Sequence, residues 1–216
     1  MAAAYVARQP ADGYNLLVTD VSFSIVPSIY KKLAYDPMKD LTPVILINSV
    51  TQALTISPEL PVNTVPELVD YAKKNPGKLV YASAGVGSLT QLGMELFKKT
   101  AGIDILHVPY RGAVPAFTDV MGGRAHMYMG ALATPLPQIM DGKLKAIAVM
   151  QKTRSELIPN VQSIVEAGYP DMDFNAYYGL LAPQGTPRPV LDKLVAAIRE
   201  TFKAPRDSKN HARPGM

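Results

Sequence analysis

Short apolar runs bounded by turn residues alternate along the chain with segments whose apolar residues recur at helical spacing. The apolar runs predict strands over residues 14–19, 43–48, 79–82, 105–108, 125–129, 145–149 and 174–181. Helical segments lie between most of these runs, and the strongest one follows Thr186 and Pro187, with Leu191, Leu194 and Ile198 on one stripe. This alternation predicts an α/β protein.

Two further helix starts are indicated by capping-box spacing, in which a hydroxyl residue precedes a glutamate by one helical turn. Thr64 and Glu67 predict a helix that ends near Lys74. Ser163 and Glu166 have the same spacing and predict a short helix, which Gly168 would close.

The segment at residues 83–88, with the sequence Ser-Ala-Gly-Val-Gly-Ser, joins a predicted strand to a predicted helix. Gly85 and Gly87 permit backbone conformations that other residues avoid, and Ser88 lies at the helix start. Free backbone amides and the positive end of the helix dipole converge there, so the loop can hold a carboxylate. A plain strand-to-helix turn with a serine cap accounts for the same pattern and is the commoner case.

Other kinds of site have little support in the sequence. The loop lacks the Gly-Lys-Ser/Thr ending of a phosphate loop and the third glycine of a dinucleotide fingerprint. The chain has no cysteine, and its histidines, His107, His126 and His211, are far apart, so we predict no metal site and no cofactor. Neither Ser83 nor Ser88 has a histidine that the sequence places as a base. We therefore predict no enzyme, with a serine hydrolase as an alternative.

Charge and composition narrow the class of partner. The net charge is +4, but the lysines form scattered pairs near predicted helix ends and no basic run is interleaved with aromatic residues. Nucleic acid is therefore not a predicted partner, while a mild positive balance favours anionic ligands. A hydrophobic fraction of 48% and a charged fraction of 19% are those of an ordinary globular protein.

Several motifs follow one another in a fixed order. They are PADGYNLL at 10–17, YDPMKD at 35–40, NPGKL at 75–79, YASAGVGS at 81–88, HVPYRG at 107–112, EAGYP at 166–170 and APQGTP at 182–187. Together they resemble the Bug family of solute receptors, the TctC-type component of tripartite tricarboxylate transporters. The resemblance extends from about residue 2 to residue 202.

This resemblance implies an α/β fold of the periplasmic binding protein type (type II), in which two lobes enclose a ligand cleft. We expect residues 1–53 and 175–203 to form the first lobe, residues 54–174 to form the second, and residues 204–216 to be a disordered tail. The implied function is a periplasmic receptor for a small organic acid: a di- or tricarboxylate, an amino acid or an aromatic acid. It would deliver this ligand to the permease subunits of the transporter.

The family holds ligand carboxylates mainly with backbone amides, hydroxyls and waters from one loop in each lobe. The resemblance places the second-lobe loop at residues 83–88, so that the ligand-binding candidates there are Ala84, Gly85, Val86, Gly87 and Ser88. Weaker candidates follow strand ends that would face the cleft: Thr19, Ser22, Tyr110, Thr134 and Tyr177.

The chain also departs from the family pattern. Residues 1–9 predict a piece of helix and contain no secretory signal peptide, and the family's first strand, first ligand loop and closing segment have no counterpart. We therefore expect the first lobe to be incomplete and the chain to be truncated at both ends. A truncated copy with impaired binding is the alternative function.

Overall fold

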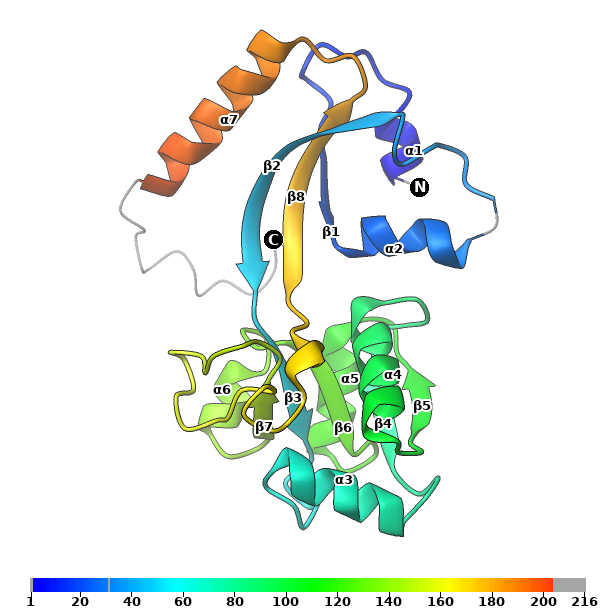
Figure 1. Ribbon diagram of the computed structural model, residues 1–216, viewed down its shortest axis with the longest axis vertical. Helices are drawn as coiled ribbons and strands as arrows, with labels where there is room; N and C mark the ends of the chain where they lie inside the picture. Colours follow the sequence, from blue (N-terminus) through cyan, green and yellow to red (C-terminus); the bar gives the residue numbers. More distant parts are fainter. Residues whose placement is uncertain (1, 31, 204–216) are drawn as a thin grey trace. The chain divides into compact units, whose positions relative to one another are not determined.

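The computed structural model describes residues 2–30 and 32–203 (Figure 1), so the predicted tail at 204–216 lies outside the described residues. The chain forms two compact units. One comprises the described parts of Met1–Thr19, Tyr30–Ile47 and Gly179–Met216, and the other comprises Asp20–Ile29 and Asn48–Tyr178. None of the described helices combines the length and the apolar character needed to cross a bilayer.

The first unit is built around a three-stranded sheet in the order β1-β8-β2. Its elements are α1 (Ala2–Val6), β1 (Leu17–Asp20), β2 (Leu41–Val50), β8 (Ala176–Pro183) and α7 (Arg188–Lys203), of which β1, β2 and β8 extend into residues of the second unit. The turn before β1 packs tightly on α7, because a Cβ atom at Gly13 would lie 2.3 Å from Cγ1 of Val190. Gly13 also has a φ of +88°, so both space and backbone conformation require glycine there.

The second unit contains a five-stranded sheet in the order β5-β4-β6-β3-β7. The strands are β3 (Gln52–Ile56), β4 (Val80–Ser83), β5 (Leu106–Pro109), β6 (Met127–Ala131) and β7 (Lys145–Val149), and α2 (Ser22–Ile29) belongs to the same unit. Strand β4 is parallel to β5 and β6, whereas β3 is antiparallel to β6 and β7. The carboxyl ends of β4, β5 and β6 therefore lie at one edge of the sheet.

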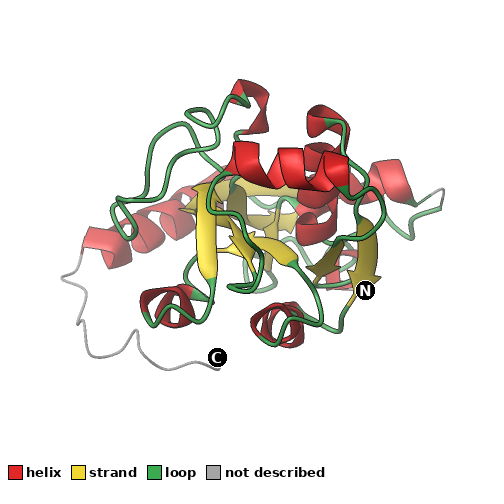
Figure 2. Cartoon of the chain, turned by 90° about the horizontal axis from the view of Figure 1, so that it is seen from below, coloured by secondary structure: helices red, strands yellow, loops and turns green. Residues whose placement is uncertain are grey.

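Both faces of this sheet are covered by helices. The helices are α3 (Val65–Lys74), α4 (Leu89–Ala101), α5 (Ala113–Met121) and α6 (Leu136–Met140), and Figure 2 shows red helices around the yellow strands. Because side chains alternate along a strand, Tyr81 packs in the core cluster of α3 and α4, whereas Ala82 packs in the cluster of α5. Met127 and Tyr128 of β6 divide between the two clusters in the same way.

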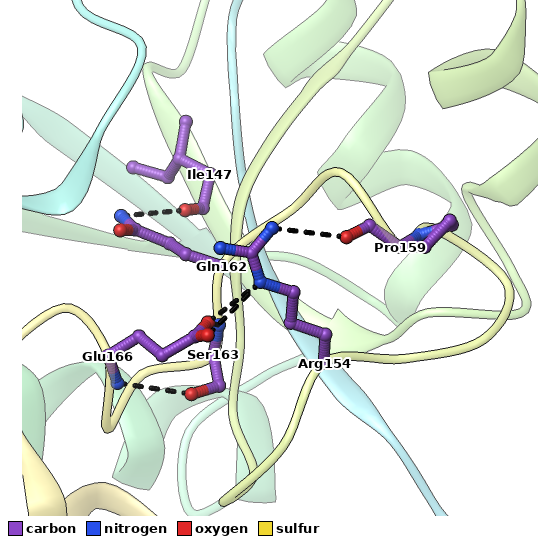
Figure 3. Close-up of polar contacts among 6 residues, drawn as sticks. All are labelled: Ile147, Arg154, Pro159, Gln162, Ser163 and Glu166. Carbon is purple, nitrogen blue, oxygen red and sulfur yellow. Dashed lines mark hydrogen bonds and ion pairs between the residues drawn. The ribbon is translucent and has the colours of Figure 1, made fainter.

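Most predicted strands and helices are confirmed with small shifts of their ends, but α2 was not predicted and the helix expected after Ser163 does not form. The capping-box bonds are present, with Ser163 N–H donating to Oε2 of Glu166 at 2.7 Å and Glu166 N–H donating to Oγ of Ser163 at 3.1 Å. Figure 3 shows Arg154 donating to the same carboxylate. The chain makes only turns here before the 3-10 helix η1 (Pro170–Met172). Gly168, with a φ of +94°, and Pro170 end the helix before it can propagate.

Candidate functional site

The loop at residues 83–88 lies at the carboxyl edge of the second unit's sheet, between β4 and α4. Gly85 and Gly87 have φ angles of +135° and +77°, in the range that favours glycine. A Cβ atom at Gly85 would lie 3.4 Å from the backbone oxygen of Tyr110, which follows β5. The prediction of a glycine-dependent turn at a helix start is confirmed.

Side chains from the first turn of α4 hold this loop in place. Ala84 N–H donates to Oγ1 of Thr90 at 2.8 Å, and Gly87 N–H donates to Oε1 of Gln91 at 2.6 Å. Ser88 is the N-cap of α4, because its Oγ accepts from Gln91 N–H at 3.3 Å and donates to the Gly85 carbonyl at 2.6 Å. Part of the loop's donor capacity is therefore used internally.

Other amides at the same place are free for a ligand. The N–H groups of Val86, Leu89 and Thr90 have no hydrogen-bond partner among the residues that the structure describes. Val86 is 76% exposed, and the first turn of α4 contains no acidic residue that would neutralise the positive end of the helix. This arrangement can bind an anionic group that approaches from solvent.

His107 contacts the loop from the neighbouring strand, which the sequence did not predict. The register of β4 and β5 pairs Tyr81 with His107, whose ring stacks on that of Tyr81 at a centroid distance of 4.7 Å. Nε2 of His107 lies 2.7 Å from Oγ of the buried Ser83, and Nδ1 lies 3.3 Å from Nε2 of Gln91. The sequence could have indicated this contact only if the predicted strands at 79–82 and 105–108 had been paired in parallel.

The electrostatic surroundings of His107 favour its neutral form. Burial lowers the pKa of His107 below its ordinary value, while Glu95 opposes this shift and Lys98 adds to it. Burial by itself would raise the pKa of Glu95, but hydrogen bonds from Tyr81 OH at 2.5 Å and from Nζ of Lys98 at 3.0 Å lower it. The Glu95 carboxylate is therefore already occupied by two donors.

Tyr110 is brought next to the loop by its backbone, while its side chain is bound elsewhere. Tyr110 N–H donates to the Ser83 carbonyl at 3.0 Å, and its hydroxyl donates to Oδ2 of Asp119 at 2.7 Å. Nε of Arg124 donates to Oδ1 of the same carboxylate at 2.9 Å. Burial raises the pKa of Tyr110 and the Asp119 carboxylate raises it further, so the phenol stays protonated.

The remaining candidates lie on other elements of the chain. Thr134 is exposed in the turn after β6, at the same sheet edge as the loop. On β8, Tyr177 is 44% exposed and its neighbour Tyr178 is 36% exposed. Thr19 lies on β1 in the other unit, and Ser22 is the first residue of α2. Their part in a ligand site stays a prediction.

Solved structures define the class of protein to which this fold belongs. The periplasmic binding protein BugD is 33% identical, with a TM-score of 0.83 over 94% of this chain and 68% of its own. A Rhodopseudomonas palustris protein with adipate is 34% identical, with a TM-score of 0.83 over 91% of this chain and 66% of its own. MatC from Rhodopseudomonas palustris with bound malate is 31% identical, with a TM-score of 0.82 over 93% of this chain and 69% of its own. The predicted α/β fold of the periplasmic binding protein type is confirmed.

The particular family follows from the sequence as a whole. The chain belongs to the TctC family, described as the tripartite tricarboxylate transporter family receptor, whose family model matches residues 1–216. A UPF0065 protein of Bordetella pertussis is 34% identical over 93% of this chain. The Bordetella pertussis protein BugT is 31% identical over 92% of this chain. The chain covers 62% and 61% of the length of these two relatives.

Proposed function

We propose that this chain belongs to a periplasmic solute receptor that captures a small organic acid and delivers it to the permease subunits of a tripartite tricarboxylate transporter. Membership of the receptor family supports this assignment. Two solved structures of the same fold contain adipate and malate, both of which are dicarboxylates. A carboxylate is therefore the ligand group that we assign.

The start of α4 carries the proposal. Its unbonded amides at Val86, Leu89 and Thr90 belong to a helix whose first turn lacks an acid of its own. A ligand carboxylate placed there would accept hydrogen bonds and meet the positive end of the helix dipole without needing a lysine or arginine. We assign Ala84, Gly85, Val86, Gly87 and Ser88 to this half of the site.

The opposite half of the site is assigned from the family resemblance. In this proposal residues 1–53 with 175–203 and residues 54–174 form lobes that close on the ligand. Thr19, Ser22, Tyr110, Thr134 and Tyr177 would complete its hydrogen bonds. Ligand clefts between lobes commonly combine a few polar groups with an enclosing surface.

Calorimetric titration and thermal unfolding of the purified chain test this function. The ligands are adipate, malate, citrate, glutamate and benzoate, with Gly85→Ala as the variant in which binding is lost. A bound acid at one hundred times its Kd stabilises the folded state by about 2.7 kcal/mol. If no acid raises the unfolding temperature of the wild-type chain, the assignment of a small organic acid as its ligand is wrong. Uptake of the labelled acid by cells that contain the membrane subunits tests the transporter partner.

A serine hydrolase is the second candidate, because Ser83 and His107 lie at the distance of a nucleophile and its base. Two features argue against it. Ser83 is fully buried, and its Oγ is already bonded to the backbone of Gly85. The imidazole is oriented by the neutral amide of Gln91. Turnover of a generic ester that disappears in Ser83→Ala would establish hydrolysis, whereas equal rates in the two proteins would remove it.

A further inference from the structure

The hydrogen bonds that run from the loop to His107 determine where each proton lies. Gly87 N–H can only donate, so the atom of Gln91 that faces it at 2.6 Å is the carbonyl oxygen Oε1. The Gln91 amino group then faces Nδ1 of His107 at 3.3 Å and can only donate. Nδ1 is therefore the unprotonated nitrogen, and Nε2 carries the proton of a neutral imidazole.

Ser83 closes this chain of hydrogen bonds at its other end. Nε2–H of His107 donates to Oγ of Ser83 at 2.7 Å, and Gly85 N–H donates to the same oxygen at 3.2 Å. The Ser83 hydroxyl uses its own proton toward the Gly85 carbonyl, also at 3.2 Å. Every donor along the path from Gly87 to Gly85 thus meets an acceptor only while His107 is neutral.

We propose that His107 and Gln91 are positioning residues that hold the ligand loop only while the imidazole is neutral, so that acidification loosens the loop and releases a bound carboxylate. This inference deepens the proposed function and rests on it. A proton on Nδ1 would face the Gln91 amino group, donor against donor. If the Gln91 amide rotates to relieve this clash, Gly87 N–H faces an amino group and loses its acceptor.

The charged groups around His107 offset that clash only in part, because the pKa of His107 is lowered overall although Glu95 raises it. Tyr81 of β4 stacks on the ring, and Glu95 and Lys98 of α4 are the charged groups that act on the imidazole among the described residues. The Glu95 carboxylate accepts hydrogen bonds from Tyr81 and Lys98, whereas the described ring partners of His107 are Ser83 and Gln91. Lys98 carries a charge of the same sign as an imidazolium.

The sign of the pH dependence follows from the direction of the pKa shift. Burial lowers the pKa of His107 from its ordinary value of 6.5, so the folded chain resists protonation. Above that value the imidazole is neutral in both folded and unfolded chains, and the loop is fully held. As the pH falls through the lowered pKa, the loop loses its support.

The first test uses the ligand-free chain and does not depend on the proposed function. Long-range 15N NMR at neutral pH should show a proton on Nε2 of His107, and hydrogen exchange at the Gly87 amide should accelerate as His107 titrates. In Gln91→Glu the new carboxylate accepts from both Gly87 N–H and Nδ1–H, so the pKa of His107 should rise above 6.5. A proton on Nδ1 in the wild type, or an unchanged pKa in Gln91→Glu, overturns the proposal.

The second test measures the affinity for adipate and malate as a function of pH. The Kd of the wild type is divided by that of His107→Asn. Protonation of the free ligand changes both values by the same factor, so the ratio does not depend on it. This ratio should rise about tenfold for each pH unit below the pKa of His107. His126→Asn is the matched control and should keep the wild-type profile, because among the described residues the ring of His126 bonds Val80 N–H, at 2.9 Å from its Nδ1, and no residue of the loop.

The outcomes separate the two proposals. If neither acid binds at any pH while the NMR titration behaves as expected, the choice of ligand is wrong. The positioning role of His107 and Gln91 then still holds. If an acid binds and the ratio stays flat across the titration of His107, the release of the ligand by acid is overturned.

Discussion

Two helices of the second unit begin with the same pattern of capping hydrogen bonds, and the side chain that completes the pattern differs in charge. Thr64 caps α3 and Ser88 caps α4, and each hydroxyl accepts from the N–H three residues later. The side chain at that later position then bonds the residue before the cap. Oε2 of Glu67 accepts from Asn63 N–H at 2.7 Å, and Oε1 of Gln91 accepts from Gly87 N–H at 2.6 Å.

The difference is one of charge, and it separates a structural helix start from a candidate binding site. Glu67 brings a carboxylate to the positive end of α3, whereas Gln91 brings only a neutral amide to the positive end of α4. The start of α4 also follows a glycine loop, while that of α3 follows Pro61, Val62 and Asn63. A helix that lacks its own carboxylate can take one from a ligand.

The largest expected effect comes from a substitution that changes the backbone of the loop before α4 and leaves the helix intact. Gly85→Ala puts a side chain where φ is +135°, at a cost of about 1–3 kcal/mol, and should abolish binding of adipate or malate in calorimetry. Gly102→Ala is the matched control, because Gly102 has a φ of +64° at the other end of α4 and a Cβ there meets nothing within 4 Å. Equal loss of affinity in both variants would show that general strain, and not the loop, governs binding.

A smaller effect is expected from removing each cap. Ser88→Ala and Thr64→Ala should each lower the free energy of unfolding by about 1 kcal/mol, measured in urea, because each leaves an amide without its acceptor. Only Ser88→Ala should also weaken ligand binding, by about fivefold. A comparable loss of affinity in Thr64→Ala would break the distinction between the two helix starts.

Exchanging the two side chains tests the charge difference directly. Glu67→Gln should destabilise the chain by about 0.3–1 kcal/mol, because α3 loses its charge at the helix N-terminus. Gln91→Glu should stabilise the ligand-free chain by a similar amount and weaken carboxylate binding at neutral pH, since the new carboxylate repels the ligand. Tighter carboxylate binding by Gln91→Glu is the result that would contradict this account.

The smallest expected effect concerns Tyr110, whose backbone supports the loop of α4. Hydrogen bonds from Arg124 and then from Tyr110 lower the pKa of Asp119 from 3.8, so its stabilising contribution is present above that value and is lost as the pH falls through the lowered pKa. Tyr110→Phe should raise the pKa of Asp119 in an NMR titration. It should also reduce the difference in unfolding free energy between neutral pH and pH values below 3.8. An unchanged pKa would mean that Arg124 alone sets it.

The local features of the site could be predicted because neighbouring residues decide them. Gly85, Gly87 and Ser88 are close enough in sequence to indicate a strand, a glycine turn and a capped helix, and all three elements are present. The motif order was also sufficient to identify the receptor family. Local spacing failed at Ser163, where the same capping box as at Thr64 forms its hydrogen bonds and no helix follows.

By itself, then, the sequence determined most of the strands and helices, the glycine turn at residues 83–88 and the family to which the chain belongs. Only the tertiary structure decided what surrounds that loop. His107 meets Ser83, 24 residues away, because β5 lies parallel to β4 in one particular register. No tight turn fixes this register, because β4 and β5 are parallel and α4 connects them, so it depends on how whole elements pack against a shared core.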